Sequence, residues 1–106
     1  MYNEIVNLIK EKKKDIDDIT SKYLANYLYV VKSKNILPPS VSFDEIVNNV
    51  LRFERIEFFD DNHYLTEKNG KDFKGLRDIK SKTLFVRDSL DDELKEITIY
   101  HELHHA

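Results

Sequence analysis

The chain has 106 residues, which is the length of one small domain. It contains no cysteine, so disulfides and thiolate metal sites are excluded, and any zinc ion must be held by histidine, aspartate or glutamate. The formal net charge is −3 and the two signs are mixed, which argues against a surface dedicated to nucleic acid, because such a surface needs a basic excess.

The N-terminus, Met1-Tyr2-Asn3-Glu4, lacks the charged-then-apolar pattern of a signal peptide. No apolar run has the length that crossing a bilayer requires. The basic run Lys10 to Lys14 is followed directly by acidic residues up to Asp18, which is typical of a solvated helix face. We therefore expect a cytoplasmic protein with no membrane partner and no direct contact with nucleic acid.

Residues 1–35 are predicted to be helical, because residues 2–35 contain no glycine or proline and their apolar residues recur at helical spacing. A break is expected near Asp15 to Asp18, where Asp15 or Asp17 would cap a second helix. That second helix is apolar around much of its circumference and should be the better buried of the two. Pro38 and Pro39 end the region and favour an extended Leu37.

Ser42 and Glu45 form a capping box, and an amphipathic helix is expected over about 43–53. Residues 55–59 are a strand candidate. The polar stretch 61–72 contains the turn signal Asn69-Gly70 and is interpreted as a mobile loop or a hairpin tip.

Two extended segments follow at 73–77 and 83–87, joined by a turn at 78–82. A last helix is expected from Ser89, capped by Ser89 and Asp92, and it runs to the end of the chain. The predicted class is α+β, with a small mixed or antiparallel sheet that includes a hairpin. We expect a single domain over 1–106, with helices over 1–35 and a core over 36–106.

The last helix ends in His101-Glu102-Leu103-His104-His105-Ala106. His101 and His105 are four residues apart, which places both imidazoles on one helix face within reach of one zinc ion. Glu102 lies about 100° round the helix from His101, close enough to accept a proton from a zinc-activated water. The pattern H-E-x-x-H on a helix is typical of zinc peptidases.

Leu90, Leu94 and Ile97 share the face of His101, so we expect that face to be buried around a metal site. Ile99 and Leu103 give the helix a second apolar side for which the sequence offers no cover. The expectation is that a further C-terminal segment, outside this chain, packs on them.

A catalytic zinc ion needs a third protein ligand. In H-E-x-x-H enzymes this ligand normally follows the motif, and the upstream candidates here are Glu57, Asp60, Asp61 and His63. His63 is more simply interpreted as an exposed loop histidine. Tyr64 and Tyr100 are candidate electrophilic helpers, although Tyr100 should point away from the metal face.

The order of these parts resembles the ImmA/IrrE family of metallopeptidases. The resemblance covers about residues 36–106 and is sharpest over 83–106, from the strand Thr83-Leu84-Phe85-Val86-Arg87 to the H-E-L-x-H-A helix. His104 stands where the family usually has glycine, and the helices that carry the third ligand do not follow. We therefore expect a truncated zincin-like domain, equivalent to about the first two thirds of the catalytic domain.

The resemblance implies a zinc ion held by His101 and His105, with Glu102 as the catalytic acid and base. It also implies an intracellular endopeptidase, often carried on mobile elements, that cleaves a helix-turn-helix repressor. Little activity is expected from this fragment alone, and the sequence predicts no particular oligomeric state.

Two alternatives remain open at this stage. One is a non-catalytic, peptidase-like module that binds a protein partner through its helical N-terminus. The other is a zinc ion shared between two copies through His101, His105 and either His104 or His63, with a zinc-dependent change in oligomeric state as its signature.

Overall fold

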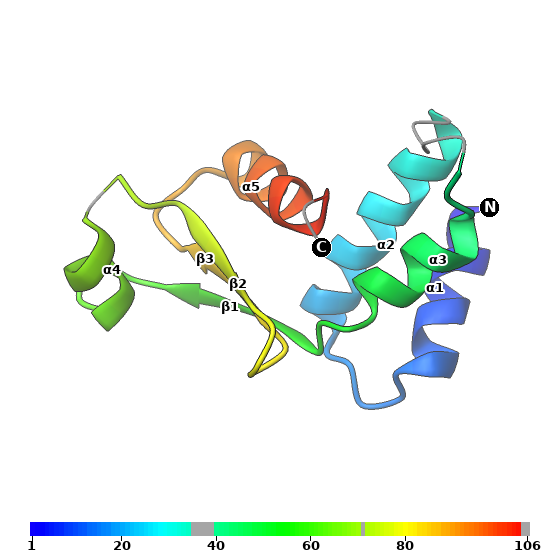
Figure 1. Cartoon of the computed structure of the whole chain (residues 1–106), viewed down its shortest axis with the longest axis horizontal. Coiled ribbons are helices and arrows are strands. Elements are labelled where there is room, and N and C mark those ends of the chain that lie inside the picture. The colour runs from blue at the N-terminus through cyan, green and yellow to red at the C-terminus, as the bar shows by residue number, and fades with distance from the viewer. Residues whose placement is uncertain (35–39, 71, 105–106) are drawn as a thin grey trace. The chain divides into compact units, whose positions relative to one another are not determined.

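The computed structural model describes residues 1–34, 40–70 and 72–104, which form five helices and a three-stranded mixed sheet (Figure 1). This confirms the predicted α+β class. The chain divides into two compact units, residues 1–54 and residues 55–106. None of the described helices combines the length and the apolar character needed to cross a membrane. The expected extended conformation of Leu37 lies outside the described residues.

The first unit begins with two helices, α1 (Tyr2–Lys12) and α2 (Asp18–Ser33). The break between them falls where the sequence predicted it, and Asp17 is the cap. Its Oδ1 accepts a hydrogen bond from the Thr20 amide at 2.7 Å, which satisfies one of the backbone donors left free at a helix start.

Helix α2 is the better buried of these two helices, as its sequence predicted. Seven of its residues are buried, compared with two in α1. Helix α3 (Phe43–Val50) packs against α2, and the Ser42 hydroxyl accepts from the Glu45 amide at 3.2 Å. The helix ends at Val50, three residues before the predicted end, and it groups with α1 and α2 rather than with the sheet.

The second unit contains the sheet, with strands β1 (Arg55–Phe59), β2 (Gly75–Asp78) and β3 (Thr83–Arg87) in the order β1-β3-β2. Strand β3 runs parallel to β1 and antiparallel to β2. All five residues of β3 are buried, as expected for a central strand. The sheet is therefore mixed and contains the β2–β3 hairpin.

Between β1 and β2 the chain forms a short helix, α4 (Tyr64–Asn69), where the sequence predicted a loop or a hairpin tip. His63 is its N-cap, because its Nδ1 accepts from the Leu65 amide at 3.2 Å. Gly70, at φ +90°, follows its last residue. The Asn69-Gly70 signal therefore marks a helix end, at a backbone angle that favours glycine.

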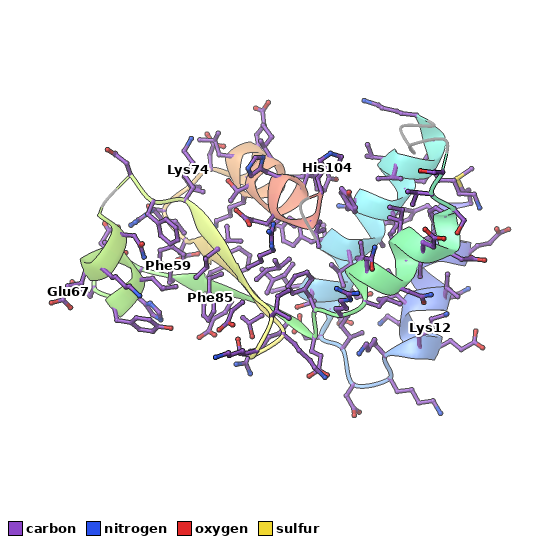
Figure 2. All side chains as sticks on the ribbon, viewed as in Figure 1. Lys12, Phe59, Glu67, Lys74, Phe85 and His104 are labelled. Atoms are coloured by element: carbon purple, nitrogen blue, oxygen red, sulfur yellow. The ribbon has the colours of Figure 1, made fainter. Side chains whose placement is uncertain are left out.

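The two faces of the sheet carry different helices. Pairing places Gly75 opposite Val86 and Arg77 opposite Leu84, so these side chains share one face. Helix α5 (Asp92–His104) packs against β2 and β3, and Lys95 lies over the Phe58 ring on this face at 5.1 Å. The opposite face carries an apolar cluster beside α4, formed by Phe59, Leu65, Phe73 and Phe85. Figure 2 labels Phe59 and Phe85 of this cluster.

Helix α5 begins three residues later than predicted. Asp91, rather than Ser89, provides the cap, because its Oδ1 accepts from the Leu94 amide at 2.8 Å. Asp92 and Glu93 occupy its first turn, where carboxylates stabilise the positive end of the helix dipole.

Candidate metal and catalytic site

His101 and Glu102 lie on the last turn of α5, and both line one cavity of about 400 Å³. The other side of this cavity is formed by residues 72–75, which lead into β2, and Thr98 completes it. Figure 2 shows Lys74, one of these residues, beside α5. The structure thus places two of the three predicted site residues at one cavity, while His105 lies outside the described residues.

A glycine brings the wall of the cavity close to α5. A β-carbon at position 75 would lie 2.8 Å from Cγ2 of Thr98 and 2.9 Å from the backbone oxygen of Phe85. Both distances are shorter than side chains tolerate, so only glycine allows β2 and α5 to approach this closely.

Glu102 points toward the sheet and is largely shielded from solvent. Its side chain is 18% exposed, and its Oε2 lies 4.0 Å from Nη1 of Arg77, whose side chain is 35% exposed. The carboxylate proposed for proton transfer is therefore flanked by a guanidinium on β2 and borders the cavity on its other side.

The side of α5 that was expected to be buried is exposed, and the side that was expected to lack a cover is buried. Ile99 and Leu103 are buried, at 0% and 3% exposure, so the prediction that the chain leaves them uncovered is wrong. Leu94 and Ile97 are 38% and 54% exposed, and His101 on the same face is also exposed. The face that carries His101 is therefore the open one, because α5 packs on the sheet through its other side.

The upstream candidates for a third ligand have other roles. His63 is half-buried as the α4 cap, and its ring centroid lies 6.1 Å from that of Phe85 on the face of the sheet opposite α5. Asp60 Oδ1 accepts from the Asn62 amide at 2.9 Å. Glu57 pairs with Phe85 in the sheet and shares that opposite face.

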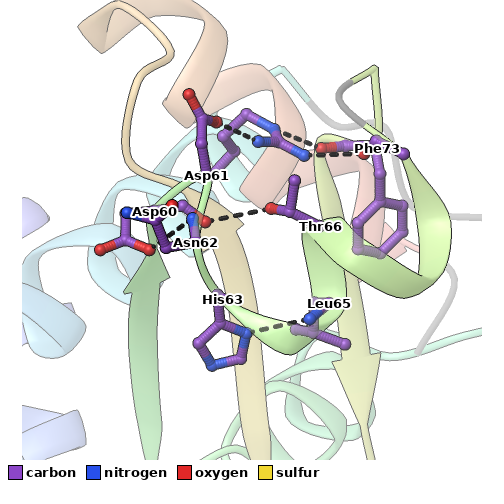
Figure 3. Close-up of polar contacts among 9 residues, drawn as sticks. Asp60, Asp61, Asn62, His63, Leu65, Thr66 and Phe73 are labelled. Carbon is purple, nitrogen blue, oxygen red and sulfur yellow. Dashed lines mark hydrogen bonds and ion pairs between the residues drawn. The ribbon is translucent and has the colours of Figure 1, made fainter.

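Asp61 is held by Arg87, a residue that the sequence reasoning did not single out. The Arg87 side chain is 4% exposed and bonds to Asp61 Oδ1 at 2.6 Å. It also donates to the carbonyls of Phe73 at 2.6 Å and Gly70 at 3.0 Å. Figure 3 shows these contacts beside α4. Arg87 thereby anchors the stretch that leads into the cavity wall, and no sequence motif marks it.

Three other residues considered in the sequence are Tyr64, Tyr100 and His104. The Tyr100 hydroxyl donates to Glu96 Oε1 on its own helix at 2.5 Å. Tyr64 is 60% exposed on α4, and His104 is exposed at the end of α5. Neither tyrosine lines the cavity that contains His101 and Glu102.

Within residues 1–34, 40–70 and 72–104, no three His, Cys, Asp or Glu side chains come together as a metal-binding group, and that range does not include His105. No protein-family model, curated protein or solved structure matches the chain.

Proposed function

We propose that this chain carries the zinc-binding helix of a metallo-endopeptidase, with His101 and His105 as zinc ligands and Glu102 as the catalytic base. One observation carries the proposal: His101 and Glu102, adjacent in an H-E-x-x-H pattern, line the same cavity at the end of a capped helix.

The chemistry of the donors fits zinc. Two imidazoles four residues apart on a helix, with no competing thiolate in the chain, form a nitrogen-rich set that suits this ion. The upstream carboxylates and His63 lie around α4 and on the sheet face beside it. His101 and His105 are therefore the two proposed ligands, and no ligand is proposed from that region.

His101 and His105 would hold the zinc ion, which when bound would supply a polarised peptide carbonyl and a water molecule of lowered pKa. Glu102 supplies the proton transfer: its carboxylate accepts the proton of the attacking water and then delivers it to the nitrogen of the departing amine. Its low exposure beside an open cavity supports this role, because the carboxylate is shielded on the sheet side and accessible to a substrate on the other.

The substrate in this proposal is an intracellular protein, and the resemblance to the ImmA/IrrE family suggests a helix-turn-helix repressor. The proposed location is the cytoplasm. Neither nucleic acid nor a membrane is part of the proposed reaction.

The test is zinc-dependent hydrolysis of a quenched fluorescent peptide library by the whole chain, compared with Glu102→Gln. We expect weak hydrolysis that requires zinc and is lost in Glu102→Gln, while the zinc content stays unchanged. Glu96→Gln is the matched control, since Glu96 lies on the same helix, bonds to Tyr100 and does not line the cavity.

Three results would contradict the proposal. The absence of any zinc-dependent hydrolysis would remove the proposed activity. Hydrolysis that survives Glu102→Gln at the wild-type rate would remove Glu102 from the reaction. A folded protein that binds no zinc would favour the non-catalytic binding module instead.

A further inference from the structure

We infer that Arg77 is a positioning residue, which holds the Glu102 carboxylate in place for proton transfer. This inference rests on the proposed peptidase function. Arg77 lies on β2, a separate element from the helix that carries the motif, and its Nη1 is 4.0 Å from Glu102 Oε2.

The geometry of β2 and α5 explains why these two residues meet. Gly75 contacts Thr98, and Arg77 is two residues further along the strand, on the same face. Two residues of strand advance about 6.6 Å, and four residues of helix advance about 6 Å. The close contact of Gly75 with Thr98 therefore sets Arg77 opposite Glu102, which lies four residues after Thr98.

The contact is better shielded than a typical surface ion pair. Glu102 is 18% exposed and Arg77 is 35% exposed, so both side chains are partly withdrawn from solvent. The guanidinium of arginine is always charged, so at 4.0 Å it attracts the Glu102 carboxylate toward the sheet.

Arg77 acts through Glu102 rather than on the substrate. Among the described residues, those that line the cavity are Asp72 to Gly75, Thr98, His101 and Glu102, and Arg77 is not one of them. Its guanidinium approaches Glu102 from the sheet, so its removal should disturb the base and leave the substrate-facing surface intact.

The test compares zinc-loaded Arg77→Gln and Arg77→Lys with the wild type on one peptide taken from the library. Displacing the carboxylate should lower kcat about ten- to a hundredfold in Arg77→Gln, with KM and zinc content unchanged. Arg77→Lys should recover part of kcat, because it keeps the charge and loses the planar donor arrangement.

Arg55→Gln is the matched control. Arg55 lies on the opposite face of the same sheet, where its Nε donates to Thr83 Oγ1 at 3.0 Å, so its loss also removes one arginine contact. It should leave kcat unchanged.

The inference is overturned if Arg77→Gln keeps the wild-type kcat while Glu102→Gln is inactive, or if it raises KM instead of lowering kcat. If Arg77→Gln does not fold, Arg77→Lys decides: a reduced kcat at unchanged KM supports the inference, and a wild-type kcat overturns it. Hydrolysis that is absent, or insensitive to Glu102→Gln, removes the proposed function and this inference together.

Discussion

Gly75 on β2 and Thr98 on α5 approach so closely that a β-carbon at position 75 would stand 2.8 Å from Cγ2 of Thr98. The same atom would lie 2.9 Å from the backbone oxygen of Phe85, which belongs to the central strand and cannot move independently. This contact sets how closely α5 sits on the sheet and forms part of the wall of the cavity.

Gly75→Ala is therefore expected to destabilise the chain. Replacing glycine by alanine at an unstrained site usually stabilises by about 0.4–1 kcal/mol through the unfolded state, whereas overpacking costs about 1–3 kcal/mol. We expect the cost of overpacking to exceed the gain from the unfolded state. The free energy of unfolding measured in urea should therefore be lower in Gly75→Ala than in the wild type. Adding Thr98→Ser should restore only part of the loss, because the Phe85 oxygen remains; a single variant as stable as the wild type would contradict this.

The elements that the sequence predicted well are those whose local signals agree with their packing. The bounds of β1 and β3 are as expected: β3 is buried throughout, and β1 buries Ile56 and Phe59 among more exposed residues. Helix α4 was missed because its six residues offer too few apolar positions to show a period. The start of α5 was shifted because both Ser89 and Asp91 are good caps, and only the backbone path selects Asp91.

The geometry of the candidate site follows only in part from the sequence, for a physical reason. His101 and Glu102 are fixed relative to each other by one helix, so sequence spacing is sufficient to relate them. Which side of that helix faces the sheet depends on tertiary packing, and the expected buried side proved to be the exposed one. Arg77 and Arg87 reach their partners through strand register and loop geometry, which a single sequence does not reveal.

Arg87→Met should destabilise the second unit strongly. The guanidinium is buried, and its loss removes the donor to the Phe73 carbonyl, at about 1–3 kcal/mol where that oxygen stays buried and unpaired. The Gly70 carbonyl also loses this donor but still accepts from the Phe73 amide at 3.4 Å. Urea unfolding measures the effect.

Asp61→Asn is the milder comparison, because Asp61 is 62% exposed and the amide oxygen still accepts from Arg87. The loss of unfolding free energy in Asp61→Asn should be smaller than the loss in Arg87→Met. Equal losses in the two variants would show that the ion pair, rather than the carbonyl contacts, anchors this segment.

Tyr27 should make stability fall at alkaline pH. Its side chain lies in the core of the first unit, 6% exposed, and burial raises the pKa of its hydroxyl above the ordinary tyrosine value of about 10. A raised pKa in the folded state means that the folded chain retains the proton longer than the unfolded chain does. The stabilising contribution is therefore complete below about pH 10 and is lost as pH rises through the folded pKa.

The measurement is the free energy of unfolding between about pH 9 and pH 11 for the wild type and Tyr27→Phe. Lysines titrate in the same range, so the difference between the two proteins isolates Tyr27. Tyr27→Phe should lose less stability over this interval. Tyr29→Phe serves as the control because that ring is 40% exposed, and an identical pH dependence in Tyr27→Phe and the wild type would contradict the prediction.

The most direct test of the zinc assignment is the zinc stoichiometry and affinity of the whole chain, measured by calorimetric titration for the wild type and three single histidine variants. The account predicts one zinc ion per chain, lost or greatly weakened in His101→Ala and in His105→Ala and retained in His104→Ala, because His104 lies outside the H-E-x-x-H spacing. Zinc binding that survives His101→Ala, or that depends equally on His104, would contradict it.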